Sequence, residues 1–219
     1  MKKLTILLLI TFAALSAHAQ LADTKWKAKV TIDDTVTVVF DFSKDVLRVY
    51  KFANIAGIEN MSYTATDSTF TIKKIEGQSD CDNEVVGKYK YRIKGNNLSI
   101  KIINDPCDDR SHVIENANWA KLVYPPEVKV DAAVLKQYIG NYVMDYQHKI
   151  TITLENGKLM AESETGNLPG KMQLYALSTA KFSLRLGDVT FDFIKGADGK
   201  ISKFVVYQAG KNYDWKKVK

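Results

Sequence analysis

Cysteine and histidine are the residues of this chain best suited to redox or metal chemistry, and both are scarce. Cys81 and Cys107 are the only cysteines, and the histidines are His18, His112 and His148. A thiol–disulfide redox site typically has two residues between its two cysteines, and a structural zinc site needs about four clustered ligands. Neither arrangement occurs, so the sequence favours a structural role for the cysteines.

Acidic residues gather around both cysteines. They are Asp80, Asp82 and Glu84 beside the first and Asp105, Asp108 and Asp109 beside the second. Pairing of the cysteines would bring these carboxylates together, and oxygen clusters are what Ca²⁺ binds. The spacing matches no calcium-binding loop, however, and exposed acidic turns are common. We therefore expect no metal ion and no other cofactor.

One segment has the spacing of a catalytic motif. Ser178-Thr179-Ala180-Lys181 has the Ser-x-x-Lys pattern of penicillin-recognising serine enzymes. That chemistry needs the serine at a helix start, with Ser-Asp-Asn and Lys-Thr-Gly elements elsewhere. Neither element is in the sequence, and the segment falls in a turn between expected strands. His112 or His148 could be combined on paper with many Ser and Asp residues, but no nucleophile-elbow pattern selects a set. We expect no catalytic residues.

Lys88–Lys94 interleaves basic and aromatic residues, as in some nucleic-acid-binding surfaces. In a strand, strict alternation places Tyr89 and Tyr91 on one face and the cations on the other. Base stacking and phosphate contacts would then fall on opposite faces. We expect a solvated strand and no nucleic-acid partner.

Residues 1–19 have the pattern of a secretory signal peptide. Met1-Lys2-Lys3 is basic, residues 4–15 are almost wholly apolar, and Ala17-His18-Ala19 is a small-x-small cleavage site. The apolar run is shorter than the roughly 20 residues that span a bilayer. Gln20, not cysteine, follows the site, so we expect no lipid anchor. We predict cleavage after Ala19 and a secreted or periplasmic protein without membrane insertion.

Cleavage changes what the composition means. Removing 19 of the 219 residues leaves 200, and the formal net charge falls from +6 to +4 because Lys2 and Lys3 are lost. With 46% apolar residues, 12 Gly and 4 Pro, the chain is neither disordered nor collagen-like. In an oxidising compartment, Cys81 and Cys107, as the only pair, are expected to form one disulfide.

Alternation of apolar and polar residues predicts strands along most of the mature chain. In the first half the expected strands are 24–32, 36–42, 46–53, 61–66, 69–75, 88–94, 98–102 and 118–124. In the second half they are 141–145, 149–154, 158–162, 172–177, 181–186, 190–195, 201–208 and 213–218. Tyr124-Pro125-Pro126-Glu127 separates the halves, since proline fits neither a helix interior nor a central strand.

These patterns predict an all-β protein of two tandem antiparallel eight-stranded barrels. Residues 22–124 would form the first barrel, 125–130 the linker and 131–219 the second barrel. One short helix is expected at the start of the second barrel, where Asp131 can cap Ala132–Gln137. A barrel is the expected arrangement because closure removes the open edges of a strand meander.

Residues 130–218 resemble the lipocalin-like C-terminal domain of β-lactamase-like serine hydrolases. The resemblance is carried by Leu135–Tyr142, Ile150–Leu159, Val189–Phe193, Asp198–Ile201 and Val206–Gly210. In that family the domain is generally accessory, and the catalytic residues belong to a separate domain that this sequence lacks.

Residues 22–124 resemble an exported lipocalin-like, calycin-type domain. The cues are Thr24-Lys25-Trp26, Tyr63–Thr66, Gly87–Tyr91, Asp105–Arg110 and Trp119. In such domains a cysteine upstream of the Gly-x-Tyr strand recurs with an Asp-Pro-Cys segment. The resemblance therefore also implies the pairing of Cys81 with Cys107.

We expect a non-catalytic exported binding protein that takes a small apolar or amphipathic ligand, or a partner protein. An eight-stranded barrel holds either its own side chains or one small ligand, and the sequence does not indicate which. The alternatives are an accessory docking module for an exported serine hydrolase and an enzyme of unknown type.

Overall fold

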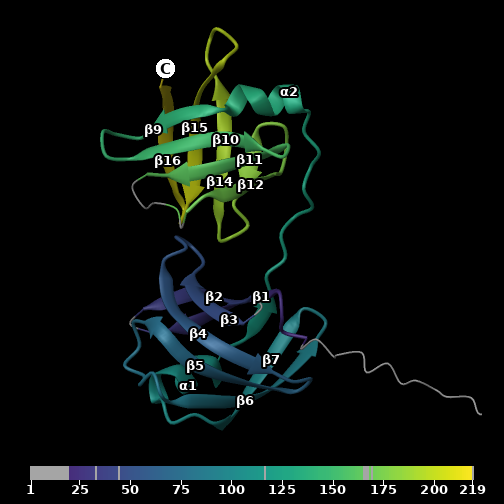
Figure 1. Cartoon of the computed structure of the whole chain (residues 1–219), viewed down its shortest axis with the longest axis vertical. Coiled ribbons are helices and arrows are strands. Elements are labelled where there is room, and N and C mark those ends of the chain that lie inside the picture. Colours follow the sequence, from purple (N-terminus) through teal and green to yellow (C-terminus); the bar gives the residue numbers. More distant parts are fainter. Residues whose placement is uncertain are drawn as a thin grey trace, which may run out of the picture.

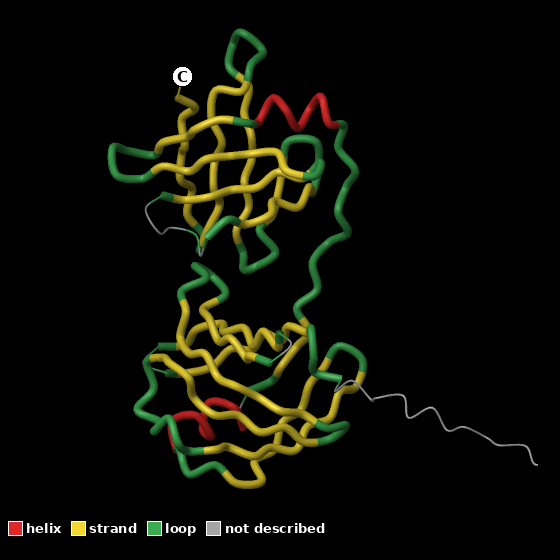
Figure 2. The backbone as a smooth tube through the Cα atoms, viewed as in Figure 1, coloured by secondary structure: helices red, strands yellow, loops and turns green. Residues whose placement is uncertain are grey.

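The computed structural model describes residues 20–32, 34–43, 45–115, 117–164, 168 and 170–218. They form two closed antiparallel barrels of eight strands each, joined by an extended linker (Figure 1, Figure 2). The predicted fold class is confirmed. The predicted signal peptide, residues 1–19, lies outside the described residues. Among the described residues, no helix is long and apolar enough to cross a membrane.

The first barrel is a meander that closes on itself. Its strands are β1 (Thr24–Thr31), β2 (Thr35–Phe42), β3 (Val46–Lys51), β4 (Gly57–Ala65), β5 (Thr69–Gly77), β6 (Val86–Lys94), β7 (Asn97–Asn104) and β8 (Trp119–Lys121). Each strand pairs with the next, and β8 closes the barrel by pairing with β1. As alternation predicts, Phe40, Phe42, Phe70, Tyr89 and Trp119 are fully buried inside it. Phe40 contacts Trp119 at 4.0 Å and Phe70 stacks on Tyr89 at 5.1 Å, between ring centres.

A helix that the sequence did not predict lies between β7 and β8. It is α1 (Asp108–Glu115). Two acidic residues lie in its first turn, where their negative charge interacts favourably with the helix dipole. Arg110 and Ile114 are its buried residues. Because only these two residues of the helix are buried, its sequence has no apolar periodicity. The sequence therefore did not indicate a helix here.

The second barrel begins with the predicted helix. α2 (Ala132–Leu135) starts at Asp131, whose carboxylate accepts the Ala133 amide hydrogen at 2.7 Å, and a 3-10 turn over Lys136–Tyr138 follows. The strands are β9 (Gly140–Val143), β10 (Lys149–Glu155), β11 (Lys158–Ser163), β12 (Met172–Ala176), β13 (Lys181–Ser183), β14 (Val189–Lys195), β15 (Ile201–Gln208) and β16 (Lys211–Val218). Closure comes from β9, which pairs with both β10 and β16.

Cys81 and Cys107 form the predicted disulfide, with 5.5 Å between their Cα atoms. It links the segment before β6 to the segment between β7 and α1. In the described part of the chain, no group of three or more His, Cys, Asp or Glu side chains is arranged to hold a metal ion.

A buried ion pair lies beside the disulfide. The Asp105 side chain has no exposed surface, and its carboxylate accepts hydrogen bonds from Arg110 Nε and Nη2, both at 2.7 Å. The Tyr89 hydroxyl and the Cys107 amide also donate to it. Gly87 makes room, since a Cβ there would lie 2.5 Å from Asp105 Oδ2. Burial alone would raise the pKa of the Asp105 carboxyl, but these donors together lower it below its usual value.

Replacing both cysteines with serine should destabilise the first barrel. The disulfide closes a loop with a sequence separation of 26. In the chain-entropy model its loss lowers the free energy of unfolding by about 3 kcal/mol. Urea unfolding followed through the separate indole N–H signals of Trp26 and Trp119 in NMR spectra measures this. The indole signal of Trp215 reports the second barrel and is the internal control, and an unchanged first-barrel midpoint would contradict the assignment.

Acid should weaken the first barrel through Asp105. Because its pKa is lower in the folded than in the unfolded chain, the stabilisation is complete above the ordinary value of 3.8 and is lost as pH falls through the folded value. Asp105→Asn should flatten this dependence. At pH 7 it should cost about 3–5 kcal/mol of unfolding free energy because Arg110 loses its buried partner. Urea titrations at stepped pH test this, with the exposed Asp109→Asn as the matched control; equal curves for the two variants would refute it.

Candidate functional site

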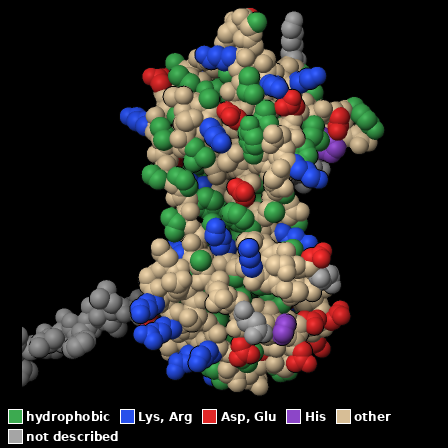
Figure 3. Space-filling view, turned by 180° about the vertical axis from the view of Figure 1, so that it is seen from behind, with side chains coloured by type: hydrophobic (Ala, Val, Ile, Leu, Met, Phe, Trp, Pro, Cys, Tyr) green, Lys and Arg blue, Asp and Glu red, His purple; other side chains and the backbone are tan. Residues whose placement is uncertain are grey.

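The two barrels meet where the turn between β3 and β4, residues 52–56, reaches the end of the second barrel (Figure 2). The Asp188 amide donates to the Phe52 carbonyl at 3.1 Å. Ile55 of this turn packs against the core of the second barrel. Seen from the opposite side, the barrels touch across a narrower waist (Figure 3).

Glycine is needed at the point of contact. A Cβ at Gly187 would lie 2.4 Å from the Phe52 carbonyl oxygen and 2.8 Å from Ile55 Cγ2. Ile55 itself has φ +56, a left-handed conformation that β-branched residues strongly disfavour. Such strain costs about 1–3 kcal/mol and persists where surrounding structure enforces it, commonly at functional sites. Here two backbone hydrogen bonds close the turn: the Ile55 amide donates to the Lys51 carbonyl and the Lys51 amide to the Ala56 carbonyl, both at 2.8 Å.

Two side chains on the outer face of the first barrel are buried. Val39 and Tyr50 are paired across β2 and β3, and they are 0% and 5% exposed. Burial, and then the nearby Tyr124 and Asp41, raise the pKa of the Tyr50 hydroxyl. Tyr124 in turn lies close enough to Arg185 and Asp188 of the second barrel for their charges to act on its pKa. This outer face therefore belongs to the contact between the barrels.

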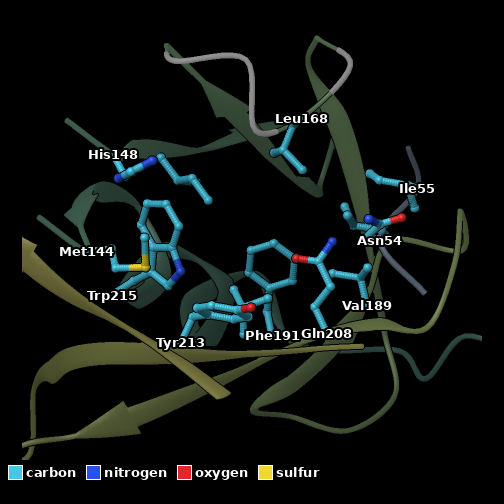
Figure 4. A pocket seen from close by; sticks show the side chains of 13 residues that line it. Asn54, Ile55, Met144, His148, Leu168, Val189, Phe191, Gln208, Tyr213 and Trp215 are labelled. Atoms are coloured by element: carbon cyan, nitrogen blue, oxygen red, sulfur yellow. The ribbon is translucent and has the colours of Figure 1, made fainter. Parts of the chain in front are cut away.

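A pocket of about 350 Å³ lies at the end of the second barrel that the turn 52–56 approaches (Figure 4). Its wall combines apolar and polar residues, and the apolar ones from the second barrel include Ile150, Leu168, Leu184, Val189, Phe191 and Val206. Its polar lining residues are Asn54, His148, Gln208, Tyr213 and Trp215. Asn54 and Ile55 come from the first barrel, so the site is composite.

Trp215 supplies an unused hydrogen-bond donor. It is 4% exposed and stacks on Phe204, with 5.8 Å between ring centres. Its indole nitrogen has no hydrogen-bond partner among the described residues, and Figure 4 shows it on the side of the ring that faces Tyr213 and Phe191. A buried donor left unpaired costs about 1–3 kcal/mol, so an acceptor in the pocket would be bound favourably.

His148 is held in one orientation. Its Nδ1 lies 2.7 Å and 2.8 Å from the two carboxylate oxygens of Asp145. The Gln147 amide, the largest cause, and the contacts from His148 lower the pKa of Asp145. An ionised carboxylate only accepts hydrogen bonds, so Nδ1 carries the proton and Nε2 remains for a ligand.

The other sequence candidates lie elsewhere. His112 is in α1 of the first barrel. Ser178 forms the turn between β12 and β13, where its hydroxyl accepts the amide hydrogens of Ala180 and Lys181 at 3.3 Å and 3.0 Å. Lys181 lies over the Tyr207 ring at 5.3 Å. As the sequence indicated, Ser178 and Lys181 are not on a helix.

Sequence reasoning assigned none of these residues to a ligand pocket, and it named His148 only as a histidine that no catalytic pattern selects. Tyr213 and Trp215 alternate along β16, a pattern that equally describes residues of a filled core. The predicted strand 181–186 also ends early, at Ser183, because Arg185 adopts φ +52. Leu184–Leu186 thereby leave the sheet and line the spaces between the barrels.

Residues 124–218 match a protein family described as Domain of unknown function (DUF3471). The match covers the linker and second barrel, and therefore the whole pocket except Asn54 and Ile55. A search of curated proteins gives no match to the chain. The family description assigns no activity.

Substituting Gly187 should weaken the contact between the two barrels. Gly187→Ala places a methyl group against the Phe52 carbonyl, and overpacking of this kind costs about 1–3 kcal/mol. We expect a larger radius of gyration in small-angle scattering while both barrels remain folded. Gly57→Ala, where a Cβ meets nothing within 4 Å, is the matched control. Equal scattering curves for the two variants would show that the contact does not hold the barrels together.

Proposed function

We propose that this protein binds a small amphipathic molecule in the pocket at the mouth of the second barrel. The observation that carries the proposal is a pocket of mixed apolar and polar lining that includes Trp215, whose buried Nε1 has no hydrogen-bond partner among the described residues. Small-molecule sites have volumes of about 300–1,000 Å³ and place a few polar groups in an apolar wall. The volume of about 350 Å³ lies at the lower end of that range.

In this proposal the ligand does not bind inside the first barrel. Its interior is occupied by contacting aromatic rings, among them Phe40, Phe42 and Phe70. Its disulfide joins the segment before β6 to the segment after β7, and the Asp105–Arg110 ion pair lies beside it. Its contribution to binding is the strained turn that brings Asn54 and Ile55 to the pocket.

The lining favours binding over catalysis. His148 and Tyr213 are the titratable groups among the described lining residues, and no serine or cysteine is among them. An acid–base pair with a nucleophile is therefore not assembled there. We propose a non-catalytic role.

Export is part of the same proposal. The signal-peptide pattern of residues 1–19 and the disulfide both suit a secreted or periplasmic protein. The resemblance to lipocalin-like domains supports ligand capture outside the cytoplasm. Fold likeness alone does not establish function, so the proposal rests on the pocket.

Binding of decanoate and decylamine tests the pocket and its donor. Both are straight-chain molecules of ten carbons, but decanoate presents acceptors and protonated decylamine presents donors. We expect isothermal titration calorimetry to show tighter binding of decanoate. Trp215→Phe keeps the ring and removes the N–H, which should weaken decanoate binding by up to about tenfold and leave decylamine unaffected.

Trp119→Phe makes the same change in the first barrel and should alter neither affinity. The proposal fails if neither probe binds. It also fails if amide chemical shifts place the bound probe in the first barrel.

A further inference from the structure

A second cavity, of about 400 Å³, lies between the barrels near the start of the linker. Lys25, Lys121 and Tyr124 line it from the first barrel and its end, and Gln173, Tyr175 and Arg185 line it from the second. It is separate in lining from the first pocket apart from Leu184, which contributes to both.

Three residues that line this cavity each have a buried polar atom without a hydrogen-bond partner among the described residues. These atoms are the Tyr124 hydroxyl, Gln173 Nε2 and Arg185 Nε. The orientation of the Gln173 amide is set by Lys158, which donates to its Oε1 at 3.3 Å, so the nitrogen is the unpaired end. Buried polar atoms are normally satisfied, so three unpaired groups on the lining residues of one cavity favour an acceptor bound among them.

Arg185 is held rigidly at this place. Its guanidinium lies over the Tyr175 ring at 4.3 Å, and its Nη2 donates to the Pro125 carbonyl at 2.7 Å. Its backbone is left-handed, with φ +52, and its amide donates to Ser183 Oγ at 3.1 Å. The strain and the fixed contacts preorganise the guanidinium, leaving Nε free.

All three unpaired groups can donate. Burial, followed by the charge of Asp41, raises the pKa of Tyr124, so its hydroxyl keeps its proton at neutral pH. Lys25, Lys121 and Arg185 give the lining more positive than negative charge, with Asp23 the acidic lining residue. Lys25 also pairs with Asp41. These two carboxylates disfavour a highly charged anion, whereas a single carboxylate accepts several hydrogen bonds with one charge.

We propose that this cavity binds a small organic monocarboxylate that bridges the two barrels. One carboxylate group supplies the acceptors that Tyr124, Gln173 and Arg185 lack. The proposal is independent of the ligand in the second barrel, because its donors belong to other residues.

Butyrate and butyramide distinguish a carboxylate site from a merely polar one. In amide chemical-shift titrations we expect butyrate to give saturable shifts at Tyr124, Gln173 and Arg185. We expect neutral butyramide to bind at least tenfold more weakly. Inorganic phosphate tests the preference for a single charge and should bind more weakly than butyrate.

Gln173→Glu replaces an unpaired donor with a negative charge of the same shape and should weaken butyrate binding more than tenfold. Tyr124→Phe should weaken it severalfold. Gln78→Glu, the same change at an exposed position of the first barrel that lines neither pocket, is the matched control and should leave butyrate binding unchanged.

The proposal is overturned if butyrate gives no saturable shifts, if butyramide or phosphate binds equally well, or if Gln173→Glu has no effect. A Tyr124→Phe variant that is more stable to heat than the wild type, with no butyrate binding, would mean that water alone fills the cavity.

Discussion

The close backbone contact between Phe52 and Gly187–Asp188 is the constraint on which the arrangement of this molecule depends. It joins the turn 52–56 of one barrel to the turn before β14 of the other. The contact is possible because position 187 has no side chain, and Ile55 of the same turn has a left-handed backbone. The turn borders the first cavity, and residues of both barrels line the second.

Buried polar atoms without a partner occur in both barrels, and their position decides what they mean. Beside the disulfide of the first barrel, Asp105 accepts hydrogen bonds from Arg110 Nε, the Tyr89 hydroxyl and a backbone amide, while Arg110 Nη1 has no partner among the described residues. Trp215, Tyr124, Gln173 and Arg185 also keep a buried atom without a partner among the described residues, and these four residues line the two cavities. Buried polar groups are normally paired, so unpaired groups on cavity-lining residues favour a bound acceptor. The place of these residues beside the cavities supports the binding proposals.

Local sequence rules predicted the elements well where one face of a strand is buried. Alternation in β6 placed Tyr89 and Tyr91 inside, and Asp131 marked the start of α2. The rules failed where the chain is shaped by distant contacts. The helix α1 has too few buried residues to show periodicity, and the expected strand 181–186 ends at Ser183 because Arg185 turns into the left-handed region. Val39 and Tyr50 point outward by alternation, yet they are buried. They lie on the outer face that belongs to the contact between the barrels.

The amino-acid sequence by itself determined two eight-stranded barrels in series and the pairing of Cys81 with Cys107. These depend on period-two alternation, turn residues and the presence of a single cysteine pair, all of which are local or countable. Only the tertiary structure decided which barrel has a pocket, which outer faces meet and which donors remain unpaired. Alternation tells whether a side chain points into its own barrel, but it carries no information on how rings fill the interior or on what covers the outside. Those outcomes depend on packing between residues as far apart in the chain as Phe52 and Gly187.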